Sequence, residues 1–458
     1  MNETLRDEYL RAQNHRGLAF IDRPYIGSPG GAAQAETNAS RIWGHMLGGF
    51  LFGYEYTRWW KESHALRGAA ILGDWSWLNK VRVTGPDASR FMAFAAVKDL
   101  SKQRIGQVIF APMVNDEGKV VVEGLSLRLA EDEYIYTAGG AETYLANLAN
   151  ETTFDIDVID VTPDFTCYAL QGPKSPDIIR ELTGTDFSHL RFSRWEKCKI
   201  LDTDVIVARQ GVTGEVGYEF YMPTSTNRGH DLWRTIREIG TPHGLRELGL
   251  KAQLIGHTET GIATSMRDYL PARGSPSLVG DKLVRRWSSS EEYNLMEGMI
   301  GEHFCSPAEL GWGYTVELDR VPFKGQKALA EEAERGGPVR KFVGLTWDSD
   351  DMAELFAGLF RDGPSPPPPD LPYGQMRVTF IPVMQNERQV GWASGYTYSP
   401  TLRRMISLAR IDRALSEPGT ELTVRWGSTF ANETTANIRA TVQSTPFIKR
   451  QRENNLSP

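Results

Sequence analysis

The segment Arg209–Tyr221, with the sequence RQGVTGEVGYEFY, combines strand-forming residues with a glycine-rich turn. Apolar and β-branched residues dominate Ile200–Ala208 on one side of the turn and Glu215–Tyr221 on the other. The glycines of Gly211–Gly217 supply the backbone freedom that a tight connection requires. The segment therefore predicts a β-hairpin. The pattern of the surrounding chain predicts an α+β fold that contains this hairpin.

The carboxylate of Glu219 lies among apolar strand residues in this hairpin. Burying a carboxylate costs free energy unless hydrogen-bond donors surround it. A flat heterocycle that carries amide and amino N–H groups would be such a donor. The alternative is a carboxylate that faces solvent on the outer face of the strand. The hairpin alone leaves both interpretations open.

The composition is that of an ordinary globular protein, with 458 residues, 40% hydrophobic and 24% charged. A chain of this length can form two or three domains with a sizeable core. The formal net charge of −7 argues against binding to nucleic acids or to acidic lipids. No apolar run approaches a membrane span, and the polar segment MNETLRDEYLRAQNHRG at the start lacks the apolar region of a secretory signal. The three cysteines are scattered, so we expect a cytoplasmic protein without disulfides.

Periodicity predicts alternating helices and strands from Ala69 onward. The expected elements are a strand at Val81–Thr84, a helix within Asp87–Asp99, a hairpin of Val120–Leu129 with Tyr134–Thr137, a strand at Cys167–Gln171, a helix capped by Ser175, and a helix at Gly229–Ile239. Short strands follow at Phe342–Trp347, Gln389–Ser394, Met405–Ile411, Thr420–Trp426 and Thr435–Val442. Their spacing, with turn residues between them, predicts a small β-barrel.

Several catalytic signatures are missing from the sequence. There is no HExxH, CxxC, EF-hand loop, P-loop, G-x-S-x-G elbow or dinucleotide fingerprint. We therefore expect no metal site, and we expect a bound organic carrier to perform the chemistry. Twelve tryptophans are present, and several crowd the first 80 residues. They suit either core packing or an aromatic-lined pocket for a flat substrate.

Three blocks of sequence together resemble the glycine-cleavage T-protein family, the folate-binding aminomethyltransferases. They are YALQGPKSPDII at Tyr168–Ile179, VTGEVGYEFY at Val212–Tyr221 and WASGYTYSPTLRRMISLARID at Trp392–Asp412. Within that family the chain is most similar to the tetrahydrofolate-dependent O-demethylases of vanillate and syringate. The segments LTWDSDDMAELFAGLF at Leu345–Phe360 and GTELTVRWG at Gly419–Gly427 resemble that branch.

This resemblance implies a three-part clover-leaf fold with tetrahydrofolate in a central cavity. The expected division is an irregular N-terminal extension at residues 1–65, two interleaved α+β subdomains at 66–335 that form the folate-binding core, a C-terminal β-barrel domain at 336–448 and a disordered tail at 449–458. Glu219 matches the family glutamate that binds the pterin ring, and charge-assisted hydrogen bonds of that kind are short and directional. The other residues expected to bind the cofactor are Gln171, Tyr218, Val212 and Arg209. Gln171 could instead cap the helix that starts near Ser175.

The resemblance also implies a reaction centre, where this chain departs from the vanillate-type pattern. Glu123 falls at the acidic position near the reacting nitrogen, although a salt-bridged strand residue is the alternative. Gln253 stands where a tyrosine is expected, and Gly139 or Gly140 where an arginine for the substrate carboxylate is expected. The run Asp74–Trp77 replaces a histidine. The substrate-binding residues expected from this alignment are Trp75, Trp77, Gln253 and Gly139.

Transfer of a methyl group from an aryl ether needs help at the leaving oxygen, because a phenol has a pKa of about 10. His257 could donate a proton as a cation, and Asp74 could donate as a buried acid with a raised pKa. Each residue could instead have a structural role. His257 could be a hydrogen-bonded structural histidine, and Asp74 could be an aspartate in a loop or turn. We therefore expect His257, Asp74 and Glu123 to be the catalytic residues.

The function expected from the resemblance is tetrahydrofolate-dependent demethylation of a methoxylated aromatic compound such as a lignin-derived benzoate. The products are 5-methyltetrahydrofolate and a phenol. The partner is a small molecule, and the oligomeric state stays open. Two alternatives remain: another folate-dependent N- or S-demethylase or aminomethyltransferase with the same fold, and a non-catalytic folate-binding protein.

Overall fold

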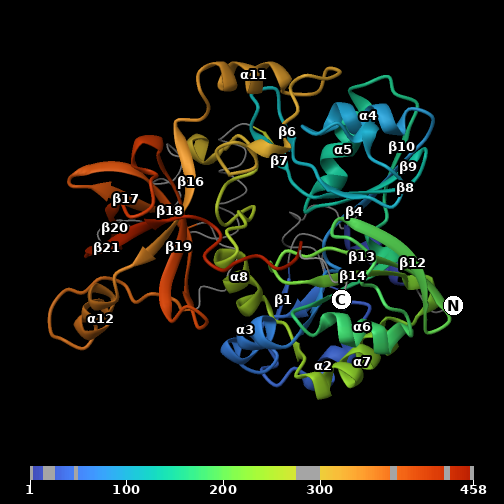
Figure 1. Cartoon of the computed structure of the whole chain (residues 1–458), viewed down its shortest axis with the longest axis horizontal. Helices are drawn as coiled ribbons and strands as arrows, with labels where there is room; N and C mark the ends of the chain where they lie inside the picture. Colours follow the sequence, from blue (N-terminus) through green and yellow to red (C-terminus); the bar gives the residue numbers. More distant parts are fainter. Residues whose placement is uncertain are drawn as a thin grey trace.

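The computed structural model describes residues 4–13, 26–45, 50–274, 300–371, 379–427 and 434–453. These residues form three parts, shown in Figure 1: two α+β parts on one side and a β-barrel on the other. This arrangement confirms the predicted α+β clover-leaf fold with a C-terminal barrel. No helix among the described residues is long and apolar enough to cross a membrane.

The first α+β part is built on a sheet of five antiparallel strands in the order β10-β4-β9-β8-β5. Its strands are β4 (Lys80–Thr84), β5 (Val108–Phe110), β8 (Leu125–Ala130), β9 (Glu133–Thr137) and β10 (Asp157–Asp160), and its helices are α4 (Ala88–Ala95) and α5 (Ala141–Asn150). A short ribbon pairs β6 (Met113–Val114) with β7 (Val120–Val122). The predicted strand at Val120–Leu129 is thus split into β7 and β8, and only β8 forms the hairpin with β9.

The second α+β part is built on a sheet of six strands in the order β12-β13-β14-β11-β3-β15. Its strands are β3 (Ile71–Asp74), β11 (Phe165–Gln171), β12 (Arg194–Ile200), β13 (Thr203–Arg209), β14 (Gly217–Pro223) and β15 (Arg246–Glu247). All pairs are antiparallel except β15 with β3. The pair β13–β14 is the hairpin predicted from the opening segment. Its helices are α2 (Gly31–Thr37), α3 (Trp59–Gly68), α6 (Ser175–Thr183), α7 (Gly229–Gly240) and α8 (Leu250–Glu259).

The two faces of this six-stranded sheet have different partners. Tyr218 and Phe220 of β14 pack with Ile178 of α6 and Trp233 of α7 in one core. Tyr221 of β14 packs in a second core with residues of the five-stranded sheet. Successive side chains of a strand point to opposite faces, so Glu219 lies on the Tyr221 side, between the two sheets.

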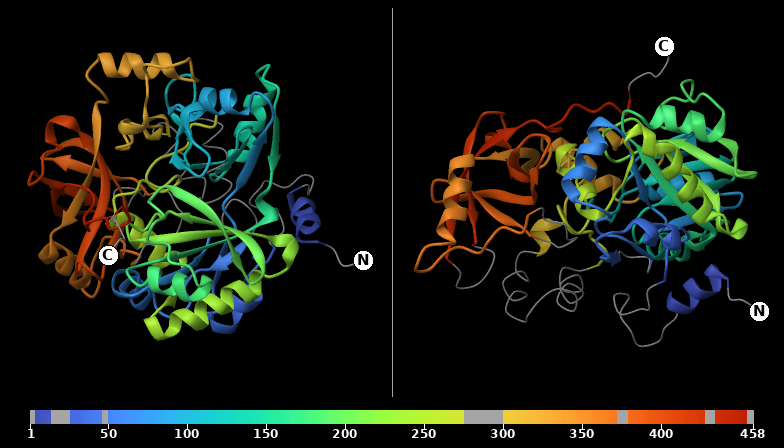
Figure 2. Two further views of the ribbon diagram at one scale, coloured as in Figure 1. Left: turned by 45° about the vertical axis from the view of Figure 1, so that its right-hand side comes forward. Right: turned by 90° about the horizontal axis from the view of Figure 1, so that it is seen from below.

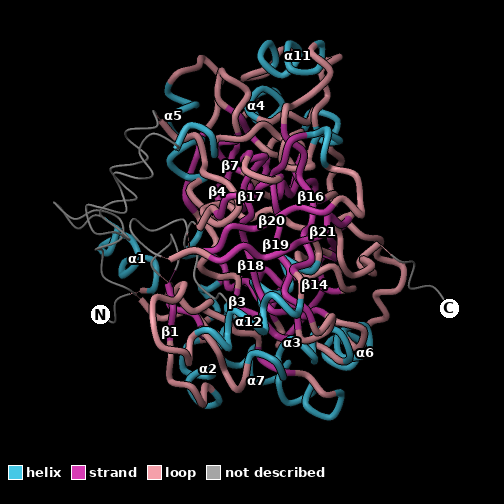
Figure 3. Tube along the Cα trace, turned by 90° about the vertical axis from the view of Figure 1, so that its left-hand side faces the viewer, coloured by secondary structure: helices cyan, strands magenta, loops and turns pink. Residues whose placement is uncertain are grey.

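The barrel is closed by six antiparallel strands in the order β16-β19-β18-β17-β20-β21. They are β16 (Arg340–Trp347), β17 (Ile381–Gln385), β18 (Arg388–Ser399), β19 (Arg404–Asp412), β20 (Glu421–Trp426) and β21 (Ala436–Gln443). Five were predicted and β17 was not. The helix α12 (Ser349–Gly358) begins at Asp348, whose side chain caps it. Figure 3, viewed from the barrel side, shows strands in the centre and helices toward the upper and lower edges.

Two further local predictions differ from the structure. The first 65 residues, expected to be irregular, contain α1 (Leu5–Gln13), α2, most of α3, and a ribbon of β1 (Trp43–His45) with β2 (Leu51–Gly53), while residues 1–3, 14–25 and 46–49 lie outside the described residues. Ser175 is the first helical residue of α6 and not its cap, because its hydroxyl donates to the Val216 carbonyl at 3.1 Å. Helix α11 (Gln326–Glu334) occupies part of the stretch before the barrel.

The tail also differs from the expectation of disorder. Residues 449–453 leave the barrel and run back across the α+β parts, as Figure 2 shows in its right-hand view. The backbone amides of Gln451 and Arg452 both donate to the Gly214 carbonyl, at 2.6 and 3.0 Å. Residues 454–458 lie outside the described residues.

Candidate active site

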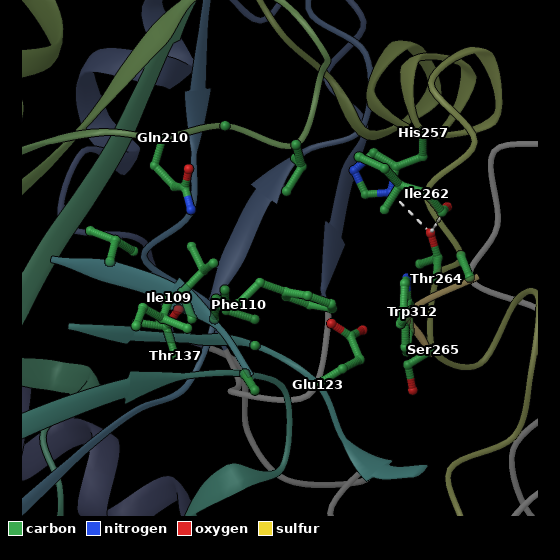
Figure 4. A pocket seen from close by; sticks show the side chains of 18 of the residues that line it. Ile109, Phe110, Glu123, Thr137, Gln210, His257, Ile262, Thr264, Ser265 and Trp312 are labelled. Atoms are coloured by element: carbon green, nitrogen blue, oxygen red, sulfur yellow. Dashed lines mark hydrogen bonds between the residues drawn. The ribbon is translucent and has the colours of Figure 1, made fainter. Parts of the chain in front are cut away.

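A cavity of about 780 Å³ lies where the three parts meet. Its walls come from the β3–β4 connection, β5, the β7–β8 connection, the end of β9, the β13–β14 turn, β14, α8, the chain after α8 and the C-terminal segment. Figure 4 shows part of this lining, with labelled side chains from β5, the β7–β8 connection, the end of β9, the β13–β14 turn, α8 and the chain after α8. Eight of the residues expected at the site line the cavity: Glu123, Glu219, Val212, Trp75, Trp77, Gln253, His257 and Gly139.

Glu219 lies in one wall of this cavity and is 3% exposed. The Tyr221 hydroxyl, two residues along β14, donates to its Oε2 at 3.0 Å. Burial raises the pKa of Glu219, while Tyr221 and the buried ammonium of Lys80 favour the charged form. A carboxylate held this way can accept hydrogen bonds from N–H groups of a flat ligand, and the strand alternation explains why it faces inward.

Gln171 ends β11 and does not line the cavity. Its amide donates to the Gln210 carbonyl at 2.8 Å and accepts from the Thr213 hydroxyl at 2.7 Å. A Cβ atom on Gly211 would lie 2.1 Å from the Gln171 amide, so the loop packs directly on this side chain. Gln171 therefore positions the turn that carries Val212 into the cavity wall, and it does not cap α6.

Arg67 of α3 fixes the same turn from the opposite side. Its Nη1 donates to the Thr213 carbonyl at 2.7 Å and to Glu215 at 2.9 Å. Its Nε and Nη2 donate to Glu259 at 3.0 and 2.7 Å, and the Ser399 hydroxyl of the barrel donates to the other oxygen of Glu259 at 2.6 Å. This buried chain of contacts joins the turn to α8 and to the barrel.

Glu123 occupies the break between β7 and β8. The neighbouring Gly124 makes the break possible, because a Cβ atom there would lie 2.0 Å from the Thr137 carbonyl oxygen. Burial raises the pKa of Glu123 to about 8, against the opposing influence of the Arg273 guanidinium and the Tyr269 hydroxyl. At neutral pH the cavity wall therefore presents a carboxylic acid that holds a proton.

Arg273 brings a guanidinium to the cavity beside Gly139 and Gly140. Its Nε donates to the Val121 carbonyl at 3.0 Å and its Nη2 to the Gly139 carbonyl. A Cβ atom on Gly140 would lie 1.9 Å from Nη1, so the guanidinium fills the space that this glycine leaves. Arg273 lines the cavity, and burial lowers its pKa. Gly139 contributes its carbonyl to holding this arginine.

His257 lies on α8 with Gln253 one turn earlier, and both line the cavity. The His257 Nδ1 lies 3.0 Å from the Thr264 hydroxyl, shown as a dashed line in Figure 4, and Nε2 has no hydrogen-bond partner in the described part of the chain. Burial and the nearby Arg267 lower the pKa of His257 to about 3. A pKa this low leaves the imidazole neutral near pH 7, which does not favour the expected cationic proton donor at this position.

Asp74, expected to be catalytic, does not line the cavity. Its carboxylate accepts from the Gln34 amide at 2.5 Å, from the Ser28 hydroxyl, and from the Ser76 backbone amide at 2.8 Å. Burial does raise its pKa, as expected. The aspartate fastens the N-terminal segment, through Ser28 and Gln34, to the end of β3.

Tyr218 and Arg209 do not line the cavity either, although both were expected to bind the cofactor. Tyr218 neighbours Glu219 on β14, so it points to the opposite face and packs against Phe187. Arg209 donates to the Leu190 carbonyl at 2.8 Å and to the Arg452 carbonyl at 3.5 Å. Its contacts hold the C-terminal segment rather than a ligand.

Aromatic rings form much of the remaining wall. Trp75 and Trp77 line the cavity as expected, and Lys80 holds their loop by donating to the carbonyls of Trp75, Ser76 and Leu78 at 3.2, 3.3 and 2.7 Å. Phe110 and Trp312, whose rings pack edge to face with centroids 5.3 Å apart, add aromatic wall that the sequence did not indicate. Among the described residues, no group of three or more His, Cys, Asp or Glu is placed to hold a metal ion.

Comparison with known proteins agrees with this architecture. Residues 46–273 match the GCVT N-terminal domain, and residues 371–449 match the glycine cleavage T-protein C-terminal barrel domain. A sesamin methylene transferase of Sinomonas sp. (strain No.22) is 28% identical over 88% of this chain and 90% of its own length. An aminomethyltransferase of Alkaliphilus metalliredigens is 28% identical over 82% of this chain and 88% of its own.

Among solved structures, the glycine cleavage system aminomethyltransferase T from Bartonella henselae has the same fold. It aligns with a TM-score of 0.70 and 20% identity over 93% of this chain and 99% of its own. Both halves of the family architecture are therefore present in order, the α+β core and the barrel. The chain belongs to the glycine-cleavage T-protein family of folate-dependent aminomethyltransferases.

Proposed function

We propose that this protein is a tetrahydrofolate-dependent O-demethylase of a methoxylated aromatic acid, giving 5-methyltetrahydrofolate and a phenol. One observation carries the proposal: a single cavity holds a buried carboxylate at Glu219, a protonated acid at Glu123 and a guanidinium at Arg273 between aromatic walls. Each of these groups has a use in such a reaction.

Tetrahydrofolate is the cofactor of this family, and the cavity residues fit it. Glu219 is a buried acceptor beside aromatic and aliphatic walls, which suits a flat ring that carries N–H donors. When bound, tetrahydrofolate supplies the N5 amine that accepts the one-carbon group. Gln171 and Arg67 support the turn beside Glu219, which holds the wall in place without touching the ligand.

Glu123 is the group best suited to assist the leaving oxygen. Its raised pKa of about 8 keeps a proton on the carboxyl at neutral pH, and this proton can be donated to an aryl ether oxygen as the methyl group departs. General acid assistance of this kind contributes roughly 10²- to 10⁴-fold. His257, being neutral, can orient the substrate through Nε2, which has no partner among the residues that the structure describes, but it carries no extra proton to donate.

Arg273 supports a substrate that carries a carboxylate. The guanidinium is buried, and its partners at Val121 and Gly139 are carbonyl oxygens that carry no charge. The neighbouring Glu123 is protonated, so it does not neutralise the arginine. Glu142 is the acid that acts most strongly on the guanidinium, through space and with no hydrogen bond between the two in the described part of the chain. A ligand carboxylate would therefore give Arg273 a direct charged partner.

A second candidate is transfer of a methylene group from a methylenedioxy aromatic compound. The similarity to the sesamin methylene transferase over 88% of this chain favours it. It would use the same cofactor and the same aromatic walls. The two candidates differ in the folate product, which carries a methyl group in one case and a methylene bridge in the other.

A product assay tests both. The purified protein is incubated with tetrahydrofolate and a panel of methoxybenzoates, their methyl esters and methylenedioxybenzenes, and the folates are measured by mass. We expect 5-methyltetrahydrofolate from a methoxybenzoate. A methylene-bridged folate would favour the second candidate. Absence of any one-carbon transfer, together with tight folate binding, would indicate a non-catalytic folate-binding protein and overturn the proposal.

A further inference from the structure

The first described residues of the chain precede the part that matches the family domain, which begins at residue 46. They are residues 4–13 and 26–45, here called the N-terminal segment, and they form α1, α2 and β1. None of these described residues lines the cavity. They do contact the β3–β4 connection, which carries Trp75 and Trp77 into the cavity wall.

Trp77 lines the cavity and also packs against two apolar clusters. One cluster consists of Tyr9, Ile26 and Phe50, all at most 3% exposed. The other includes Phe52, whose ring centroid lies 5.8 Å from that of Trp77. Tyr9 and Ile26 belong to the N-terminal segment. Part of the support of Trp77 therefore comes from outside the family domain.

Specific contacts hold this support in place. The Tyr9 hydroxyl donates to Asp160 at 3.0 Å, and the Tyr9 ring stacks on Phe50 with centroids 5.5 Å apart. The backbone amide of Leu51 donates to the Ile26 carbonyl at 2.9 Å. The cluster is thus tied to the chain on both sides of it.

The connection that carries Trp77 is itself fixed at both ends. At one end, Ser28 and Gln34 of the N-terminal segment donate to the Asp74 carboxylate. At the other end, the Lys80 ammonium donates to three carbonyls of the connection. Between these ends, close packing determines where the Trp77 ring lies.

We infer that the N-terminal segment limits the width of the aromatic substrate that the cavity accepts, by holding Trp77 in the wall. This inference rests on the proposed function, because it takes an aromatic compound as the ligand beside Trp77. Tyr9 and Ile26 touch no ligand, so they act as positioning residues. A smaller side chain in their cluster leaves space that its neighbours fill only in part. The Trp77 ring can then move away from the cavity, and a wider substrate fits.

A comparison of two substrates of different width tests this role. The ratio of kcat/KM for a methoxynaphthoate to kcat/KM for the corresponding methoxybenzoate is measured with tetrahydrofolate in excess. The variants are Ile26→Ala and the milder Ile26→Val. The matched control is Ile438→Ala in the barrel, because Ile438 is 2% exposed, against 3% for Ile26, and does not line the cavity. Dissociation constants for tetrahydrofolate are measured for all four proteins.

We expect Ile26→Ala to raise this ratio roughly tenfold, the lower end of what one methylene group changes in a hydrophobic pocket. Ile26→Val should raise it less, and Ile438→Ala should leave it unchanged even where it lowers stability. Tetrahydrofolate affinity should match the wild type in every variant. If Ile26→Ala does not fold, Ile26→Val decides the question.

An unchanged ratio in the folded Ile26 variants, or an equal rise in Ile438→Ala, would overturn this inference alone. Loss of stability by itself lowers both rates and does not favour the wider substrate, so a raised ratio distinguishes positioning from a general structural role. A wild type that transfers a methyl group from neither acid would overturn the proposed function, and this inference with it.

Discussion

The Arg273 guanidinium fills the space that a side chain on Gly140 would take, with Nη1 1.9 Å from the position of that missing Cβ atom. Gly140 has a φ of +74° and precedes α5, so the glycine serves both the backbone and the arginine. The arginine comes from a segment more than 130 residues away in the chain and lines the cavity beside this glycine.

Replacing Arg273 by Gln should weaken the use of carboxylated substrates. Loss of a buried charge-assisted contact costs about 1.5–3 kcal/mol, so we expect KM for a methoxybenzoate to rise roughly 10- to 100-fold. KM for the corresponding methyl ester should change little. Initial rates with each acid and its ester measure the difference. An equal effect on both would exclude a carboxylate contact.

Gly140→Ala should disturb the same site without removing a charge, because its Cβ atom would displace Arg273. Gly184→Ala is the matched control, since Gly184 also has a positive φ, +69°, but a Cβ atom there meets nothing within 4 Å. Both variants should lose about 1 kcal/mol or more of stability from backbone strain. Only Gly140→Ala should raise KM for the acid. Similar kinetics in the two variants would contradict this account of Gly140.

Glu219→Gln should weaken tetrahydrofolate binding about 10- to 100-fold, because a charged acceptor becomes a neutral one. Tyr218→Phe is the control on the same strand: its hydroxyl lies on the opposite face and has no hydrogen-bond partner among the described residues. Fluorescence titration with tetrahydrofolate compares the two. Unchanged affinity in Glu219→Gln would mean that another group anchors the ring.

The rate of methyl transfer should fall as pH rises through about 8, where Glu123 loses its proton. Glu123→Gln should lower kcat roughly 10²- to 10⁴-fold and leave tetrahydrofolate affinity nearly unchanged. The folded state holds this proton above the unfolded value of 4.5, so its contribution to stability is complete below pH 4.5 and is lost as pH rises to about 8. The variant should lack that pH dependence in denaturant titrations. A wild-type rate that stays flat to pH 9 would remove Glu123 from the acid role.

Asp74→Ala should destabilise the protein without impairing the chemistry of the folded fraction. Three donors, on Ser28, Gln34 and Ser76, would lose a buried acceptor, which costs about 2–4 kcal/mol in total. Urea unfolding measures the loss, and kcat at a temperature well below unfolding should stay within about twofold of wild type. A kcat that collapses while the fold remains intact would restore Asp74 as a catalytic candidate.

The hairpin and the barrel strands could be predicted because alternation and turn residues are local properties of the sequence. The same alternation also shows why Tyr218 does not reach the cavity: adjacent residues on one strand point to opposite faces, and Glu219 faces the cavity. Strand β17 (Ile381–Gln385, IPVMQ) escaped prediction because it is short and contains Pro382, a residue that argues against the interior of a strand.

The substrate side of the site could not be predicted, because distant segments assemble it. Arg273 and Trp312 reach the cavity from the chain after α8, a stretch whose patterning gave no clear elements. Arg450 and Arg452, which also line the cavity, come from a polar tail that composition alone assigns to disorder. The lowered pKa of His257 arises from burial and from the nearby Arg267. The spacing of residues along the sequence reveals neither of these influences.

The contacts of Glu259 have a consequence for protein engineering. Glu259 accepts hydrogen bonds from Arg67 and from Ser399 of the barrel, and Arg67 also donates to the turn at Thr213. Hydrogen bonds therefore connect the barrel to the cavity wall that we expect to receive the cofactor. A chimaera that grafts the barrel of a relative onto this core would keep a sound cofactor site only if Arg67, Glu259 and the residue at position 399 are exchanged as a set. The barrel and the α+β core of this protein are therefore not interchangeable modules.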